Sequence, residues 1–553
     1  MNRHEEFIEK LLFSNSYMLA QDLNVALQTE FGVSGPYGRK IIERAVEAYV
    51  IVPSAIRFGK NQFAYVHPKK QLTKDLVLQI AAKHRPSLFR LIVGMDINNG
   101  IISYYEAMKI AGCPVEEGKT KNDSVDKLFL EVELLGYASQ FANKDGVRFL
   151  VSSRDAKHAD YLMAKAFKQM SIDAMFVPDI LRALQRFNII SNDRVLYRNK
   201  TEPQLGVNHN NFKWDAIAYT RTTGINEARS SESNTYDKQT LVVLDVIVSR
   251  KYTDHDLQGF LSRIQGTISS VKTGKRKVLP IVIYSGIESR ILINRIKKLG
   301  FLSFDLGTIY GSKIYRIIEC IQSVKNTDDF TEGTIDDRIE EALETIENTG
   351  QADNLSNIKG DLFESLMFPV LNTIFSGSDI ETSKELKNRN EGKTEKYEYD
   401  YIIRNSRLRE ITIIELKGFA SSRYIDLGDI DRNNTLTWFF GRTLPFAKKM
   451  LQNDGLKITA SYITTANFTS EGIEFLEGLQ NGALKPNVLD VWYDGTKLLN
   501  LLKEHGFQKP LELVQKYYIK AEPSKVKVPF GAEDMPYEIE TALQTDLPDL
   551  GDF

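Results

Sequence analysis

The chain has 553 residues, and its 71 Lys and Arg residues nearly balance its 73 Asp and Glu residues. This length exceeds what one hydrophobic core supports and predicts several domains, while the near-zero net charge excludes a protein coated uniformly in positive potential. Two cysteines without metal-ligand spacing, and apolar runs that all fall short of the roughly 20 residues that span a bilayer, exclude a disulfide framework and a transmembrane helix.

Residues 1–75 are the first predicted domain. Their charged amphipathic start is unlike a signal peptide, so we expect a cytoplasmic protein that does not bind a membrane. The predicted elements are helices at 5–13, 18–31 and 37–49 and strands at 50–58 and 62–66. This order outlines a winged helix, a fold that contacts DNA in some proteins and other proteins in others. The candidate DNA-binding residues lie on its third helix and in its hairpin: Tyr37, Arg39, Lys40, Arg44, Arg57 and Lys60.

Residues 76–154 repeat this outline as a second winged-helix-like domain. The predicted elements are helices at 88–96, 103–111 and 123–135 and strands at 136–142 and 146–151. The third helix is acidic, with Asp123, Asp126, Glu131 and Glu133. Because acids repel phosphate, two interpretations of this domain stay open, a second DNA contact and a spacer.

Residues 155–325 alternate strands and helices. The predicted elements are strands at 211–220, 239–250, 278–284 and 301–305 and helices at 254–270 and 288–299. Asp215 and Asp245 lie on the first two strands. The pattern predicts a domain of the α/β class.

The same order of elements returns in residues 355–520, after a linker and charged helix at 326–354. The predicted elements are helices at 360–369, 438–451, 470–479 and 494–502 and strands at 396–403, 411–417, 457–464 and 488–493. We interpret the two regions as an internal pair of related domains. The last segment, 521–553, is rich in acids and prolines and predicts a disordered tail.

The predicted hairpin at 396–417 carries the most chemistry. Period-two geometry places Glu415 and Lys417 on one face of their strand, and the preceding strand delivers Asp400 to the same edge. Two carboxylates beside an ammonium suit a Mg²⁺-dependent phosphodiesterase, which needs oxygen ligands for the ion and a cation near the attacking water.

With the helix that carries Glu364, these residues resemble the PD-(D/E)xK nuclease superfamily, and the order of elements over about 355–506 is similar to that of the Mrr-like type IV restriction endonucleases. The resemblance implies that Asp400, Glu415 and the Leu416 carbonyl bind Mg²⁺, for which Mn²⁺ can substitute. It implies that Lys417 orients or activates water and that Glu364 acts through the outer shell or a second ion. Asp361, one helical turn from Glu364, is the alternative for that last role.

The first copy departs from this motif. Asp245-Val246-Ile247 stands where the second copy has Glu415-Leu416-Lys417, so we expect a degenerate nuclease domain. The alternative is that Arg250 or Lys251 supplies the missing cation. The expected fold class is multi-domain, α+β and α/β, with two winged-helix-like units before two restriction-endonuclease-like α/β domains, the first degenerate.

The resulting hypothesis is a Mg²⁺-dependent DNA endonuclease that acts in restriction or anti-phage defence. Two alternatives stay open: a DNA repair nuclease or junction resolvase, and a non-catalytic winged-helix regulator or scaffold with relic nuclease folds. Cutting both strands with one active domain per chain predicts a homodimer. The chain has no GxxxxGK[ST] phosphate loop, so a helicase, another ATPase or a methyltransferase is an expected partner class.

Overall fold

A computed structural model describes residues 2–70, 72–116, 123–191, 194–220, 240–270, 278–326, 332–349, 352–390, 393–419, 423–452 and 455–519. The tail expected at 521–553 lies outside these residues. The chain separates into two compact units that mix helices with small sheets, in agreement with the expected mixed class. Within the described ranges, no helix is both long enough and apolar enough to cross a bilayer.

The first unit comprises Met1–Phe167, Asn208–Lys213 and Thr253–Lys272. Two successive segments in it share the order helix, strand, helix, helix, strand, strand. The first contains α1 (Arg3–Ser14), β1 (Met18–Leu19), α2 (Ala20–Phe31), α3 (Gly35–Glu47), β2 (Val52–Phe58) and β3 (Gln62–Val66). The second contains α5 (Pro86–Ile97), β4 (Ile101–Ser103), α6 (Tyr104–Ala111), α7 (Val125–Leu134), β5 (Ala138–Ala142) and β6 (Arg148–Ser152). Their sheet orders, β1-β3-β2 and β4-β6-β5, are equivalent.

Local sequence explains where these helices begin. Asn2 and Glu5 form a reciprocal capping box at the start of α1, and the hydroxyls of Ser103 and Ser124 accept hydrogen bonds from the first turns of α6 and α7. One prediction here was wrong, because Met18 and Leu19 form a strand that pairs with β3 instead of extending α2. The helix α4 (Lys74–His84) was not predicted.

The remaining elements around the first unit are short strands and long helices. They are a 3₁₀ turn at Ala156–His158, α8 (Ala159–Met175), β8 (Val207–His209), β9 (Phe212–Trp214) and α10 (Asp254–Ser270). The boundary at Phe167 falls inside α8. Gly112 ends α6 at φ 68°, and a Cβ there would lie 2.7 Å from Ser262 of α10, so the contact requires glycine.

The second unit contains two five-stranded sheets. The first has the order β7-β10-β11-β12-β13, with β7 (Leu196–Tyr197), β10 (Ala216–Thr220), β11 (Thr240–Ile247), β12 (Val278–Tyr284) and β13 (Leu302–Asp305). Its helices are α9 (Val177–Arg186), α11 (Arg290–Lys298), α12 (Leu306–Tyr310) and α13 (Ile314–Asn326). Every residue of β11 is buried, which agrees with its apolar sequence, in which Asp245 is the one charged residue.

The second sheet has the order β14-β15-β16-β18-β20. Its strands are β14 (Asp379–Asn390), β15 (Lys393–Asn405), β16 (Glu410–Lys417), β18 (Lys457–Thr464) and β20 (Trp492–Tyr493). The helices are α14 (Glu332–Asn348), α15 (Ser356–Ile374), a π-helical turn (Trp438–Thr443), α16 (Leu444–Leu451), α17 (Ser470–Gln480), α18 (Gly495–Glu504) and α19 (Gln508–Tyr517). A separate parallel pair consists of β17 (Tyr424–Ile425) and β19 (Asn467–Phe468).

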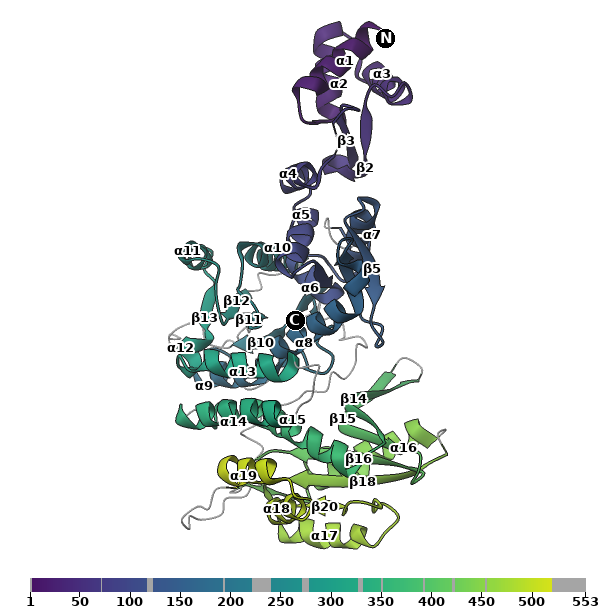
Figure 1. Ribbon diagram of the computed structural model, residues 1–553. Helices are drawn as coiled ribbons and strands as arrows, with labels where there is room; N and C mark the ends of the chain where they lie inside the picture. Colours follow the sequence, from purple (N-terminus) through teal and green to yellow (C-terminus); the bar gives the residue numbers. More distant parts are fainter. Residues whose placement is uncertain are drawn as a thin grey trace, which may run out of the picture. The chain divides into compact units, whose positions relative to one another are not determined.

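The two sheets have the same topology. In each, the first three strands pair antiparallel and the last three pair parallel, with β7, β10, β11, β12 and β13 equivalent to β14, β15, β16, β18 and β20. Helices α9, α13, α14 and α15 share one hydrophobic cluster with residues of both sheets, and Figure 1 shows α13, α14 and α15 in adjacent rows. Both sheets are therefore built on one core.

Several element boundaries differ from the predictions. The strand expected at 211–220 is interrupted at Asp215 and becomes β9 and β10, and the strand expected at 488–493 is reduced to β20. The strand β14 and the helix α19 were missed. The sequence of β14 alternates charged residues with few apolar ones, which is typical of an edge strand and gives little hydrophobic periodicity.

Candidate active site

The β15–β16 hairpin brings three of the predicted site residues together. The strands pair antiparallel from Tyr401 opposite Ile414 onward, and Asp400 lies one residue beyond that pair. The Leu416 backbone N–H donates to Asp400 Oδ2 over 2.6 Å. Lys417 Nζ lies 2.6 Å from Glu415 Oε1 and 3.7 Å from Asp400 Oδ2.

Burial and the neighbouring charges shift the pKa values of Asp400 and Lys417. Burial raises the pKa of the Asp400 carboxyl well above its usual range, an effect that Lys417 opposes and Glu415 reinforces. Burial also disfavours the Lys417 ammonium, but Asp400 and Glu415 outweigh it and hold the pKa of Lys417 well above its ordinary value. Lys417 is thus a permanent cation between two acids.

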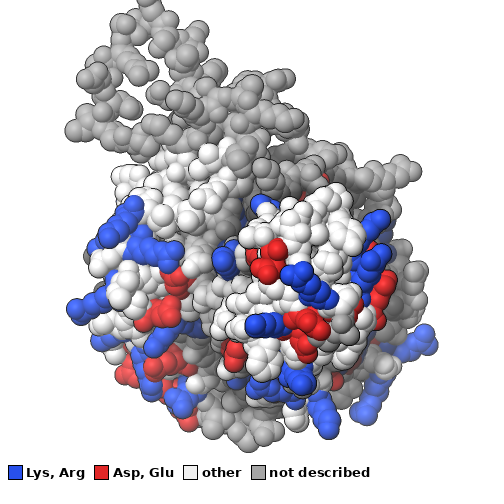
Figure 2. Space-filling model, turned by 90° about the horizontal axis from the view of Figure 1, so that it is seen from above, with Lys and Arg blue, Asp and Glu red and all other residues white. Residues whose placement is uncertain are grey.

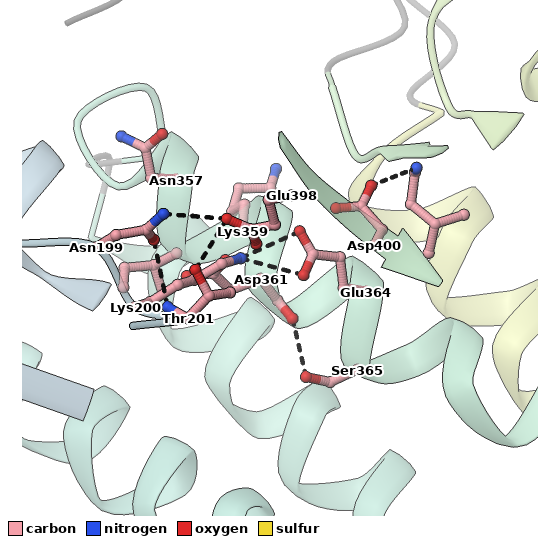
Figure 3. Close-up of polar contacts among 12 residues, drawn as sticks. Asn199, Lys200, Thr201, Asn357, Lys359, Asp361, Glu364, Ser365, Glu398 and Asp400 are labelled. Carbon is pink, nitrogen blue, oxygen red and sulfur yellow. Dashed lines mark hydrogen bonds and ion pairs between the residues drawn. The ribbon is translucent and has the colours of Figure 1, made fainter. Parts of the chain in front are cut away.

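The helix α15 presents Asp361 and Glu364 at the same pocket, one turn apart. Both carboxylates face Lys200, whose Nζ lies 3.1 Å from Glu364 Oε2 and forms an ion pair with Asp361 (Figure 3). Lys200 comes from the segment after β7, 164 positions before Glu364. Sequence reasoning missed it, and the only available signal was a run of five polar residues directly after a short strand.

We call residues 198–202 the strap. Asn199 Nδ2 and Thr201 Oγ1 both donate to Glu398 Oε2, over 3.0 and 2.9 Å. At one end of the strap Arg198 pairs with Asp215 over 3.0 Å, and at the other end Glu202 pairs with the β14–β15 hairpin. The strap therefore joins the first sheet to the candidate site on the second.

These groups line a pocket of about 260 Å³. Its walls include the strap, α15, the ends of β15 and β16, and the loop around Asn433 and Asn434. Six of its side chains are carboxylates: Asp361, Glu364, Glu385, Glu398, Asp400 and Glu415. Three are lysines, Lys200, Lys396 and Lys417, while the guanidinium of Arg198 is balanced by Asp215. The pocket carries an excess of acid.

The donor set suits a hard divalent cation, because carboxylate and carbonyl oxygens are the ligands that Mg²⁺ prefers. Asp400, Glu415 and Leu416 could supply them. In the described part of the chain, no group of three or more His, Cys, Asp or Glu side chains lies in an arrangement that could hold a metal ion. The lysines account for this, because the carboxylates of Glu415 and Glu364 form ion pairs with Lys417 and Lys200 and do not point toward a shared ion position.

The first sheet has the same backbone arrangement with different chemistry. The Val246 N–H donates to Asp215 Oδ2 over 2.8 Å, as Leu416 donates to Asp400. Here, however, Arg198 binds Asp215, and the Tyr252 hydroxyl donates to Asp245 Oδ2 over 3.0 Å. Ile247 occupies the position equivalent to Lys417. Both acids of this site are thus engaged by protein groups.

The predicted DNA-binding residues are exposed. Tyr37, Arg39, Lys40 and Arg44 lie on the outer face of α3, whose inner face buries Ile41, Ile42 and Ala45. Arg57 is the penultimate residue of β2, and Lys60 lies in the turn that follows. Arg57 also stacks over the ring of Phe63 at 4.6 Å. Figure 2 shows Lys and Arg side chains interspersed with acids on the visible face, without a continuous positive surface.

Asp123, just before α7, and the acids of α7 itself have partners inside the first unit. Asp123 and Glu131 pair with Arg85 over 2.8 and 2.6 Å, and Asp126 pairs with Arg148 over 2.7 Å. Glu133 accepts a hydrogen bond from the Gln140 side chain. These acids therefore connect the elements of their own segment.

Known proteins add no assignment to this geometry. Comparison of the chain with protein-family models, curated proteins and solved structures gave no match. The function must be argued from the residues of the pocket.

Proposed function

We propose that this protein is a Mg²⁺-dependent DNA endonuclease of the PD-(D/E)xK type, with its active site on the second sheet. The observation that carries the proposal is the group of Asp400, Glu415 and Lys417, in which Lys417 Nζ lies 2.6 Å from Glu415 Oε1 and 3.7 Å from Asp400 Oδ2. The strand order around them, an antiparallel hairpin followed by two parallel strands, also supports it.

Each residue has a distinct role in this proposal. Asp400, Glu415 and the Leu416 carbonyl would hold Mg²⁺, which when bound supplies a Lewis acid for the scissile phosphate and its water. Lys417 would stabilise the negative charge that develops on the phosphoryl oxygens and orient the water. Its ammonium, 2.6 Å from Glu415 Oε1, is positioned beside the proposed ion for this electrostatic role.

The charge of the pocket explains the need for a metal. Six carboxylates against three lysines would repel a DNA phosphate. A divalent cation between Asp400 and Glu415 offsets two of these negative charges, so binding of the ion and of the backbone are coupled. DNA affinity should therefore be lower in chelator than in Ca²⁺, which occupies the site as a hard cation.

Of the two N-terminal segments, the first is better suited to contact DNA than the second. Their shared order, α-β-α-α-β-β with the last strand in the centre of the sheet, is that of a winged helix, and the first segment leaves the basic face of α3 exposed. The acids of α7 are engaged in ion pairs, which favours a spacer role for the second segment. We therefore assign DNA contact to the first segment.

The proposal is tested by incubating wild type, Asp400→Asn and Lys359→Met with plasmid, linear, branched and single-stranded DNA, in Mg²⁺ and in chelator. Lys359 is a matched control because it lies on α15 outside the pocket and forms a largely buried ion pair with Glu347 of α14. We expect cleavage by wild type and Lys359→Met in Mg²⁺ alone. Preference for branched DNA would assign a repair nuclease or resolvase, and binding without cleavage of any substrate would assign a scaffold.

The resemblance to restriction enzymes supports a role in defence against foreign DNA. With one active site proposed per chain, cutting both strands would take two chains. Sedimentation of the protein with and without a DNA duplex tests the expected homodimer.

A further inference from the structure

The strap enters the candidate site from a different sheet and is fixed along its whole length. Arg198 is 2% exposed and binds Asp215 and the Met170 carbonyl, and β7 immediately before it pairs with β10. The side chains of Asn199, Thr201 and Glu202 bond to residues of β14 and β15. Lys200, in the middle, is held where a free lysine would otherwise sample many rotamers.

Lys200 faces several acids at once. Asp361, Glu364 and Glu398 all act on its ammonium, and together they outweigh burial and hold its pKa well above the ordinary value. Glu364 acts in turn on Asp400, whose pKa it helps to raise. Glu364 therefore lies between two cation positions, one filled by Lys200 and the other proposed for Mg²⁺ (Figure 3).

We propose that Lys200 stands in for a second divalent cation and restricts the active site to one bound metal ion. This inference rests on the proposed function. Because Glu364 is paired with Lys200, it is withheld from metal binding, and the ion is held by Asp400 and Glu415. The sheet that has lost its own acid-and-lysine group thus contributes a positioning residue to the active site of the other.

The charge balance supports one ion over two. Without Lys200, the excess of acid in the pocket rises by one, and Asp361, Glu364 and Glu398 all lose the charge of this ammonium. A second hard cation would then find oxygen ligands beside the first, as in nucleases with paired ions. With Lys200 in place, a second ion would have to displace an ammonium that is anchored on both sides.

The test is the number of Mn²⁺ ions bound per folded chain, measured by equilibrium dialysis and by the electron paramagnetic resonance of free Mn²⁺. We expect one ion for the wild type and two for Lys200→Met. Lys359→Met, the control on α15, should bind one.

Two double variants separate the role of Glu364 from a general effect of charge. Lys200→Met with Asp361→Asn keeps Glu364, and Lys200→Met with Glu364→Gln removes it, at the same net charge. We expect two ions for the first and one for the second. Since each removes a cation with an acid, they also test the idea if the single variant does not fold.

The possible failures are distinguishable. A wild type that binds no Mn²⁺ overturns the proposed function as well. A wild type that binds one ion in an Asp400-dependent way, together with folded Lys200 variants that all bind one, overturns only the role of Lys200. Two ions bound by the wild type would also refute it.

Discussion

The sharpest prediction concerns Lys417→Met. The substitution keeps the length of the side chain. It removes the ammonium that lies 2.6 Å from Glu415 Oε1. If Lys417 stabilises charge in the transition state, as proposed, its loss should lower the cleavage rate constant by about 10²- to 10³-fold, the usual effect of removing one such group. The assay is single-turnover cleavage of supercoiled plasmid in Mg²⁺.

The same variant should be less stable in chelator. Removing one partner of a buried ion pair costs about 3–5 kcal/mol because the other charge is left uncompensated. The Lys417 side chain is 18% exposed, so we expect about 3 kcal/mol, the lower end of that range. Urea unfolding followed by tryptophan fluorescence, with Trp438 near the pocket, reports this loss.

Mg²⁺ should reverse most of this destabilisation. Without the ammonium, Asp400 and Glu415 have no competing cation, and saturation at about 100 times the dissociation constant adds about 2.7 kcal/mol. Lys359→Met loses an ion pair of similar burial but should gain no more from Mg²⁺ than the wild type does. The reasoning is refuted if Lys417→Met cleaves at the wild-type rate, or if Mg²⁺ stabilises it no more than it stabilises Lys359→Met.

Three further predictions follow from individual contacts. Burial raises the pKa of Asp179, which caps α15, from 3.8 to about 6, so its contribution to stability is present below pH 4 and lost as pH rises through 6. The unfolding free energy of wild type relative to Asp179→Asn should fall by about 3 kcal/mol between pH 4 and pH 8, and a flat difference would contradict this. Arg198→Met leaves Asp215 buried without its guanidinium and should cost about 3–5 kcal/mol in urea unfolding, most of which Asp215→Asn in the same chain restores. Replacing the exposed bases of α3, Arg39, Lys40 and Arg44, with Ala should reduce the slope of log K against log salt for duplex DNA by about 3, whereas Glu47→Ala should leave the slope unchanged.

Local patterns predicted the hairpin and the residues on it. The apolar run of β16 is buried, and the antiparallel pairing with β15 then brings Asp400 to the end of β16 that carries Glu415. The helical starts at Asn2, Ser103 and Ser124 follow from short-range capping. Where periodicity and capping agree, the element lies close to its predicted position.

Long-range contacts could not be predicted in this way. Lys200 reaches Asp361 across 161 positions, and nothing in the strap itself marks the lysine as different from a solvated surface charge. The strand β7 is two residues long and carries too little periodicity to be recognised. Its role depends on pairing with β10, which is a property of the folded sheet.

The two sheets suggest how one backbone arrangement supports two outcomes. In both, a backbone N–H fixes an aspartate beside the next strand, through Val246 to Asp215 and through Leu416 to Asp400. In the first sheet Arg198 approaches the aspartate as a fixed guanidinium that cannot be deprotonated, so the acid is permanently neutralised and no place is left for an ion. In the second sheet the nearest cation is Lys417, 3.7 Å away and shared with Glu415, a looser arrangement from which a divalent ion can take over the carboxylates. If the proposed function holds, the cation beside the aspartate, rather than the fold around it, decides which of the two sheets binds the ion.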